Sequence, residues 1–167
     1  TIAEVLKQAG YKTGAFGKWG LGYPGSKGDP NFQGFDQFYG YNCQRVAHNY
    51  YPTHLWDNQV KEFLEGNDGK TATTYAPELI HQKALSFLEE NKKVPFFMFY
   101  PSVIPHAELV APEEYMEKYR DKYLPEKKYV KKGEGYSIQG YNTQYESHAA
   151  FAAMVSILDQ QVGEIID

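Results

Sequence analysis

A glycine-rich stretch near the amino terminus, residues 10–22, constrains the fold of this 167-residue chain more than any other feature. Gly10 lacks a Cβ, so it can adopt the left-handed conformation that ends a helix. Residues 11–16 combine β-branched and aromatic side chains, which predicts a short strand. Glycines follow at positions 17, 20 and 22, with Lys18 as the one charged residue among them. Because ligands of open α/β sheets bind beyond the carboxyl ends of the strands, the stretch predicts that Lys18 holds an anion.

The order of the elements predicts an α/β fold. Residues 1–9 form a helix that opens with a capping box and has an apolar face of Ile2, Val5, Leu6 and Ala9. After the strand and an insertion come a helix over 75–91 and an apolar run over 95–103, which is typical of a central parallel strand buried on both faces. The helical pattern of residues 144–167 closes the chain.

Two ranges lie outside this helix–strand order. Residues 41–70 are rich in polar and aromatic side chains and contain weak alternation with a Gly/Asn/Asp turn, which predicts a peripheral insertion with a hairpin. Residues 124–143 hold lysines, glycines and tyrosines without periodicity, so we expect a long loop there.

A second candidate for anion binding follows the apolar strand, where Pro105 and His106 stand directly after it. Two parallel strands end on the same side of a sheet, so we expect Lys18 and His106 to approach one another. Both side chains can donate hydrogen bonds to an anion.

Composition excludes some classes of partner. The net charge of −4 argues against a nucleic-acid partner, which would favour a basic face. The longest apolar run, residues 94–104, is interrupted by Pro95 and Pro101 and is far shorter than the ~20 residues of a membrane helix. Cys43 is the only cysteine, so the chain predicts no internal disulfide.

Three segments carry a family resemblance. These are residues 10–13 with the following Gly17-Lys18-Trp19, the Pro105-His106 pair, and the helical sequence of residues 153–166. In these segments, which occur in the family's order, the chain resembles the sulfatases of the alkaline-phosphatase-like superfamily. The resemblance implies an alkaline-phosphatase-like sheet flanked by helices on both faces, of which residues 1–167 are a central portion. We therefore expect part of a single catalytic domain that is cut at both ends.

The resemblance also implies the chemistry, which is hydrolysis of a sulfate ester of a carbohydrate or similar compound. In the family a formylglycine, made from a Cys or Ser in a Cys/Ser-x-Pro-x-Arg motif, attacks sulfur, and a calcium ion polarises the sulfate. Lys18 and His106 are implied to bind sulfate oxygens. Cys43 is followed by Gln44-Arg45-Val46, so it is not the nucleophile, and we expect the nucleophile and the calcium ligands outside this chain. No metal ligand is predicted within it.

One departure from the family lies inside the glycine-rich stretch. Many sulfatases have a histidine where this chain has Gly20, so either the donor is dispensable or another histidine supplies it. His48, in a polar loop, is our candidate for that histidine. Arg45 and His54 are candidates for contacts with the sugar of the substrate.

Two other functions stay open at this point. A phosphate or phosphonate ester hydrolase of the same superfamily would share these motifs, and so would a non-catalytic module that binds an anion or glycan. The resemblance implies a secreted, periplasmic or lysosomal location, and the sequence does not indicate an oligomeric state.

Overall fold

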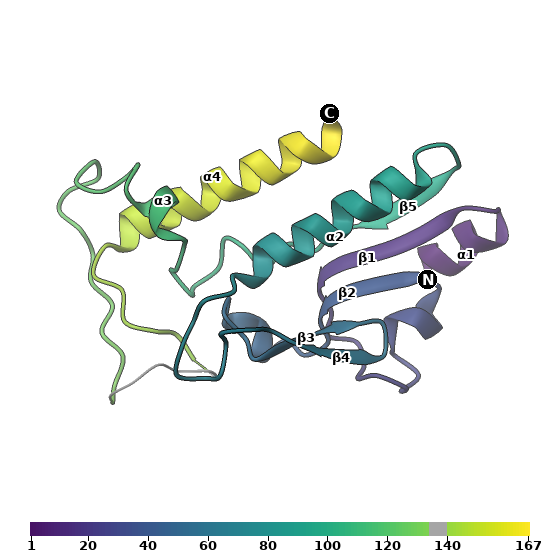
Figure 1. Cartoon of the computed structure of the whole chain (residues 1–167), viewed down its shortest axis with the longest axis horizontal. Coiled ribbons are helices and arrows are strands. Elements are labelled where there is room, and N and C mark those ends of the chain that lie inside the picture. The colour runs from purple at the N-terminus through teal and green to yellow at the C-terminus, as the bar shows by residue number, and fades with distance from the viewer. Residues whose placement is uncertain (134–139) are drawn as a thin grey trace.

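Five strands form the sheet of this chain, in the order β4-β3-β2-β1-β5 (Figure 1). The structure is a computed structural model that describes residues 1–133 and 140–167. In chain order the elements are α1 (Ile2–Gln8), β1 (Lys12–Lys18), the 3₁₀ turn η1 (Pro30–Gln33), β2 (Gln37–Tyr41), the 3₁₀ turn η2 (Val46–His48), β3 (His54–Asp57), β4 (Val60–Phe63), α2 (Ala76–Asn91), β5 (Phe96–Phe99), α3 (Glu113–Met116) and α4 (Ser147–Ile166).

Strand β1 lies between two parallel neighbours. It pairs with β2 and with β5, and the register places Lys18 opposite Tyr41 and Ala15 opposite Phe99. On the other side of β2, β3 and β4 continue the sheet as antiparallel strands. Because β1, β2 and β5 run in one direction, their carboxyl ends meet at the same end of the sheet.

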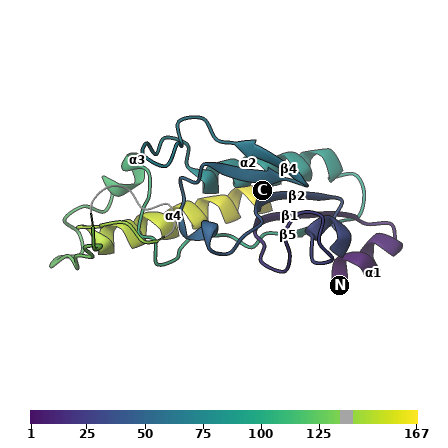
Figure 2. The ribbon, with the colours of Figure 1, turned by 90° about the horizontal axis from the view of Figure 1, so that it is seen from below.

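Helices cover both faces of the sheet, and α1 and α2 lie on opposite sides of the strands (Figure 2). On one face Ala3 of α1 packs with a cluster that includes Ala15 and Phe38. On the other face α2 and α4 bury residues against the sheet, and this core includes Phe16, Tyr39, Ile80, Phe87 and Met154. The prediction of an α/β sheet with helices on both faces is confirmed.

Strand β5 differs from its prediction. The apolar run was expected to form a central strand buried on both faces, but among the described strands β5 pairs only with β1. Phe96 and Phe99 are 37% and 41% exposed. The prediction of burial on both faces is therefore wrong for this structure, because burial of a strand depends on what pairs with it and not only on its own side chains.

The two ranges outside the helix–strand order extend the fold in different ways. Residues 41–70, predicted as a peripheral insertion, contribute β3 and β4, a hairpin that turns at Asn58 with a positive φ of 53°. Within the predicted loop 124–143, residues 134–139 lie outside the described part of the chain. The remainder holds no helix or longer strand, and the Tyr129–Gln144 bridge pairs it with the segment before α4.

Helix α4 passes the length and hydropathy test for a membrane-spanning helix, and it is the one described helix that does so. One face of it is buried, however, through Ala149, Ala153, Met154 and Ile157. These residues pack against α3 and into the core that α2 shares. We therefore interpret α4 as a core helix of the fold.

Candidate functional site

The candidate site lies where β1, β2 and β5 end. Lys18 is the last residue of β1, and its backbone N–H donates to Pro101 O, just after β5, at 2.9 Å. The next backbone N–H, of Trp19, donates to Tyr41 O at the end of β2, at 2.8 Å. These two bonds hold the end of β1 against the segment after β5 and against the end of β2.

Two glycines allow these strand ends to come unusually close. Gly17 has φ of +135° and Gly40 has φ of +150°, in a region that other residues rarely adopt. A Cβ on Gly17 would lie 2.2 Å from Pro101 O, and a Cβ on Gly40 would lie 2.0 Å from Gly17 O. Backbone atoms of the neighbouring segments thus fill the space that a side chain at either position would need. This close packing fixes the position of the Lys18 backbone at the end of β1.

His106 is held by a turn anchored in the core. Val103 and Ile104 are buried, and the Tyr50 hydroxyl donates to Val103 O at 3.1 Å. Burial raises the pKa of Tyr50 and the nearby Glu108 raises it further, while a hydrogen bond from the backbone N–H of His106 lowers it. Tyr50 therefore holds both ends of the short segment that leads to the exposed His106 ring.

His48 lies in the same region as Lys18 and His106. Its imidazole lies at the end of η2 and stacks on that of His106, with ring centroids 5.0 Å apart and planes 21° apart. Burial lowers the pKa of His48, and the positive charges of Lys18 and His106 lower it further. The structure thus brings three of the five predicted site residues together, from three separate segments.

We expect His48 to titrate below the ordinary histidine pKa of about 6.5 and to be neutral at pH 7. The Lys18→Gln substitution removes a positive charge that disfavours the imidazolium, so the pKa of His48 should rise. An NMR titration of the histidine signals in the full-length protein measures both values, with Lys12→Gln at the far end of β1 as the control. A pKa of His48 that does not respond to Lys18→Gln would contradict this placement.

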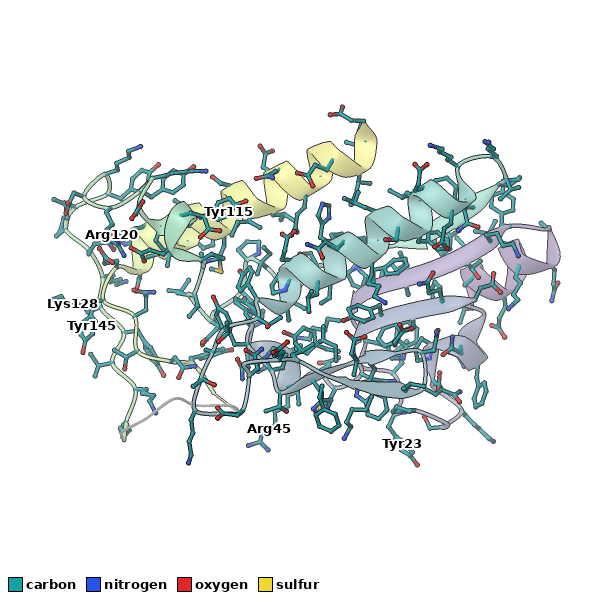
Figure 3. All side chains as sticks on the ribbon, in the orientation of Figure 1. Tyr23, Arg45, Tyr115, Arg120, Lys128 and Tyr145 are labelled. Carbon is teal, nitrogen blue, oxygen red and sulfur yellow. The ribbon has the colours of Figure 1, made fainter. Side chains whose placement is uncertain are left out.

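Arg45 and His54 lie differently. Arg45 precedes η2, is exposed, and extends outward from the lower edge of the molecule in Figure 3. His54 belongs to β3, where its Nδ1 lies 3.1 Å from Thr53 Oγ1 and its ring packs against Trp56 and Phe63, with centroids 6.0 Å away in both cases. Both contacts place His54 in the β3–β4 hairpin and not in the histidine pair.

The space beside Gly20 is filled by a residue that the sequence reasoning missed. A Cβ at Gly20 would lie 2.3 Å from both Cγ and Nε2 of Gln44, so this side chain occupies the place of a side chain at position 20. His48, the candidate replacement for the family's histidine, lies against His106 instead. The amide of Gln44 therefore lies where a side chain of residue 20 would begin, and His48 as the replacing histidine stays a prediction.

A second missed residue is Tyr141. Its ring lies 5.6 Å from the His48 ring and 6.2 Å from the His106 ring, centroid to centroid. It comes from the predicted loop 124–143, in which no periodicity singled out one tyrosine from the others. The tyrosine-rich composition of that loop was the only signal in the sequence.

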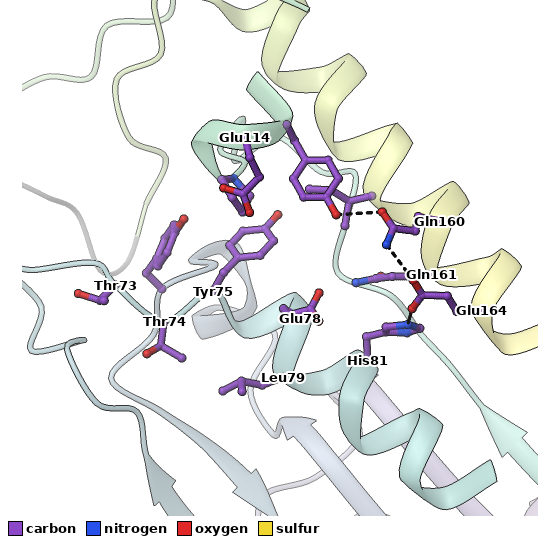
Figure 4. A pocket seen from close by; sticks show the side chains of 14 residues that line it. Thr73, Thr74, Tyr75, Glu78, Leu79, His81, Glu114, Gln160, Gln161 and Glu164 are labelled. Atoms are coloured by element: carbon purple, nitrogen blue, oxygen red, sulfur yellow. Dashed lines mark hydrogen bonds and ion pairs between the residues drawn. The ribbon is translucent and has the colours of Figure 1, made fainter. Parts of the chain in front are cut away.

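A cavity of about 520 Å³ lies elsewhere, between α2, α3 and α4 (Figure 4). His81 is buried in its wall, and its Nε2 lies 2.6 Å from Glu164 Oε2. The lining also includes Glu78 and Glu114. None of the five predicted site residues lines this cavity, so it is separate from the candidate anion site.

The residues of this chain do not fit the calcium or formylglycine that the resemblance implies. Among residues 1–133 and 140–167, no group of three or more His, Cys, Asp or Glu side chains is placed to hold a metal ion. Cys43 is exposed and is not followed by the x-Pro-x-Arg sequence. We therefore assign neither group, and no reaction step through either, to this chain.

Comparison with known proteins identifies the family. The Sulfatase family model matches residues 1–167. The N-acetylglucosamine-6-O-sulfatase of Bacteroides thetaiotaomicron is 31% identical over 127 residues, which cover 75% of this chain and 20% of that protein. The crystal structure of Ps i-CgsB in complex with k-i-k-neocarrahexaose aligns with a TM-score of 0.70 at 25% identity, over 99% of this chain and 35% of the other.

A third comparison adds a substrate complex. The structure of BT4656 in complex with its substrate D-glucosamine-2-N,6-O-disulfate aligns with a TM-score of 0.57 at 28% identity, over 76% of this chain and 23% of the other. In all three cases the chain spans about a third or less of the length of the protein that it resembles. The match of the family model over every residue, together with these alignments, shows that the chain belongs to the sulfatase family.

Proposed function

We propose that the protein to which this chain belongs hydrolyses sulfate esters of carbohydrates, and that the chain supplies part of the sulfate pocket. The observation that carries the proposal is the meeting of Lys18, His48 and His106 where the parallel strands end, in a chain that matches the family along its whole length. An ammonium and two imidazoles in one place are suited to an oxyanion, since all three can donate hydrogen bonds.

Each residue has a distinct part in this proposal. Lys18 places a fixed positive charge against a sulfate oxygen, which stabilises the charge that develops during transfer. His106, the exposed ring of the pair, binds a second oxygen and protonates the leaving oxygen of the ester. His48 is neutral at pH 7 because its pKa is lowered, so it contributes a hydrogen bond but no charge. That Arg45 and His54 contact the sugar stays a prediction from the sequence.

The two cofactors that the family implies belong to the rest of the protein in this proposal. Calcium would supply the polarisation of the sulfate, and formylglycine, a modified side chain, would supply the nucleophile. The residues of this chain act only on the remaining oxygens of the sulfate and on the leaving group.

A carbohydrate sulfate is the substrate class that the relatives favour. The Bacteroides relative is named for a sulfated amino sugar, and two of the similar structures contain a saccharide. The site also lies at the strand ends, where His106 is exposed, and not in the cavity between the helices. A site with an exposed histidine accommodates a sugar that continues beyond the esterified ring.

A substrate panel tests this proposal on the purified full-length protein. We expect release of inorganic sulfate from N-acetylglucosamine 6-sulfate, D-glucosamine-2-N,6-O-disulfate or 4-nitrophenyl sulfate, at a kcat/KM at least about 100-fold above that for 4-nitrophenyl phosphate or a phosphonate ester, a difference of about 2.7 kcal/mol in transition-state stabilisation. Faster hydrolysis of the phosphorus esters would support the phosphate or phosphonate reading. Binding of sulfated sugars without hydrolysis of any ester would support the non-catalytic reading.

A further inference from the structure

The ring of Tyr141 lies beside the two stacked histidines, His48 and His106. Its ring is tilted by 47° to the His48 ring and by 41° to the His106 ring, and it is only half-buried. It therefore packs against both imidazoles and still presents part of its ring to solvent, next to the position proposed for the sulfate.

A buried carboxylate holds the residue next to Tyr141. Both oxygens of Glu108 accept hydrogen bonds from Asn142, one from the backbone N–H and one from the side-chain Nδ2, each at 2.9 Å. Glu108 is 1% exposed, and it stands two residues after His106 in the chain. A third hydrogen bond, from Gln144 Nε2 to Leu109 O at 2.7 Å, connects the same two segments.

Burying the carboxyl group of Glu108 costs free energy, which packing of its side chain alone would not require. Burial raises the pKa of Glu108, while the two Asn142 donors lower it, so these hydrogen bonds offset part of the cost of a buried carboxyl group. The contact joins the segment that carries His106 to the segment that carries Tyr141.

We infer that Tyr141 is the platform on which the sugar ring of the substrate stacks, and that the Glu108–Asn142 contact positions this platform. The inference rests on the proposed function, because it concerns the group that carries the sulfate. A pyranose ring presents C–H groups on its faces, and these suit the negative face of an aromatic ring. With the sulfate held by Lys18 and His106, the sugar is brought against a ring that already lies beside His106.

The Tyr141→Ala variant of the full-length protein separates sugar binding from sulfate binding. The probes are the sulfated sugar of the panel that the wild-type protein turns over fastest, and inorganic sulfate, which lacks a sugar. We expect the KM for the sugar to rise about tenfold, the scale of one aromatic contact, while the inhibition constant of inorganic sulfate stays within twofold. Tyr141→Phe should behave as wild type. Tyr145→Ala, an exposed tyrosine of the same segment, is the matched control.

Glu108→Gln tests the positioning role. A glutamine presents an NH₂ group to the Asn142 donors, so the two-point contact is lost while the shape of the side chain is kept. We expect its KM for the sugar to rise with little change in kcat, and we expect no further rise in the double variant with Tyr141→Ala. Effects that add in the double variant would show that Glu108 does not act through Tyr141.

The other outcomes each decide a separate question. Equal weakening of sugar and inorganic sulfate by Tyr141→Ala would overturn the inference, because the ring would then only support the histidines, and so would no weakening of either. A wild-type protein that hydrolyses aryl sulfates but no sulfated sugar would overturn the sugar platform and leave the sulfatase activity standing. Hydrolysis of no sulfate ester, with tight binding of sulfated sugars that Tyr141→Ala weakens, would overturn the activity and leave the platform standing. Without either hydrolysis or sugar binding, both proposals fail.

Discussion

Lys18→Ala in the full-length protein is expected to lower kcat for sulfate-ester hydrolysis by about 10²- to 10³-fold, the scale seen when one preorganised donor to a developing oxyanion is removed. The backbone N–H of Lys18 donates to the segment after β5 and that of Trp19 donates to the end of β2, so the Lys18 side chain starts from a fixed point. Alanine keeps these backbone hydrogen bonds and removes the side chain beyond Cβ together with its charge. We expect the thermal unfolding midpoint to change little.

The matched control for this prediction is Lys12→Ala. Lys12 lies at the other end of the same strand and is exposed, so the substitution removes an equal charge far from the site. We expect near-normal turnover from it. His106→Ala should resemble Lys18→Ala in kcat, because its ring lies at the same strand ends. Normal turnover in Lys18→Ala or in His106→Ala would remove that residue from the proposed site.

Local sequence patterns predicted the elements that place Lys18 and His106. The capping box of Thr1 and Glu4 opens α1 as expected, and the apolar runs became β1 and β5. These features depend on capping, on local conformational preference and on the rule that parallel strands end on the same side of a sheet. The sequence alone therefore predicts that the residues at these strand ends approach one another.

The packing partners could not be predicted in the same way. The apolar face of α1 was expected to include Ile2 and Val5, but both are 64% exposed, and the helix packs through Ala3. The small side chain of Ala3 lets the helix lie close to Ala15 on β1. A periodic pattern indicates which residues are apolar, but the closest approach between two elements depends on which side chain is small.

The missed site residues have a related cause. Gln44 and Tyr141 both lie outside helices and strands, so no periodicity marked them. Gln44 is placed by the absence of a side chain at Gly20, and Tyr141 by the hydrogen bonds between Asn142 and Glu108. Each placement depends on a contact between segments far apart in the chain, which single-residue patterns do not record.

Gly17→Ala is expected to destabilise the full-length protein by about 3 kcal/mol and to reduce turnover as well. The φ of +135° places alanine in a strained conformation, at about 1–3 kcal/mol. The added Cβ would also lie 2.2 Å from Pro101 O, and relieving such a contact costs about 1–3 kcal/mol more. The backbone of the next residue, Lys18, donates to that same oxygen, so the shift that relieves the clash displaces the lysine.

Gly10→Ala separates the two contributions to this loss. Gly10 also has a positive φ, of 87°, but a Cβ there would meet nothing within 4 Å. It should therefore show the backbone strain alone, with a smaller loss of unfolding free energy in urea and unchanged turnover. If Gly17→Ala matched Gly10→Ala in both measurements, β1 would not be packed against Pro101 as closely as the structure has it. The position of Lys18 would then need another explanation, because the close approach of these two backbones fixes where the lysine side chain begins.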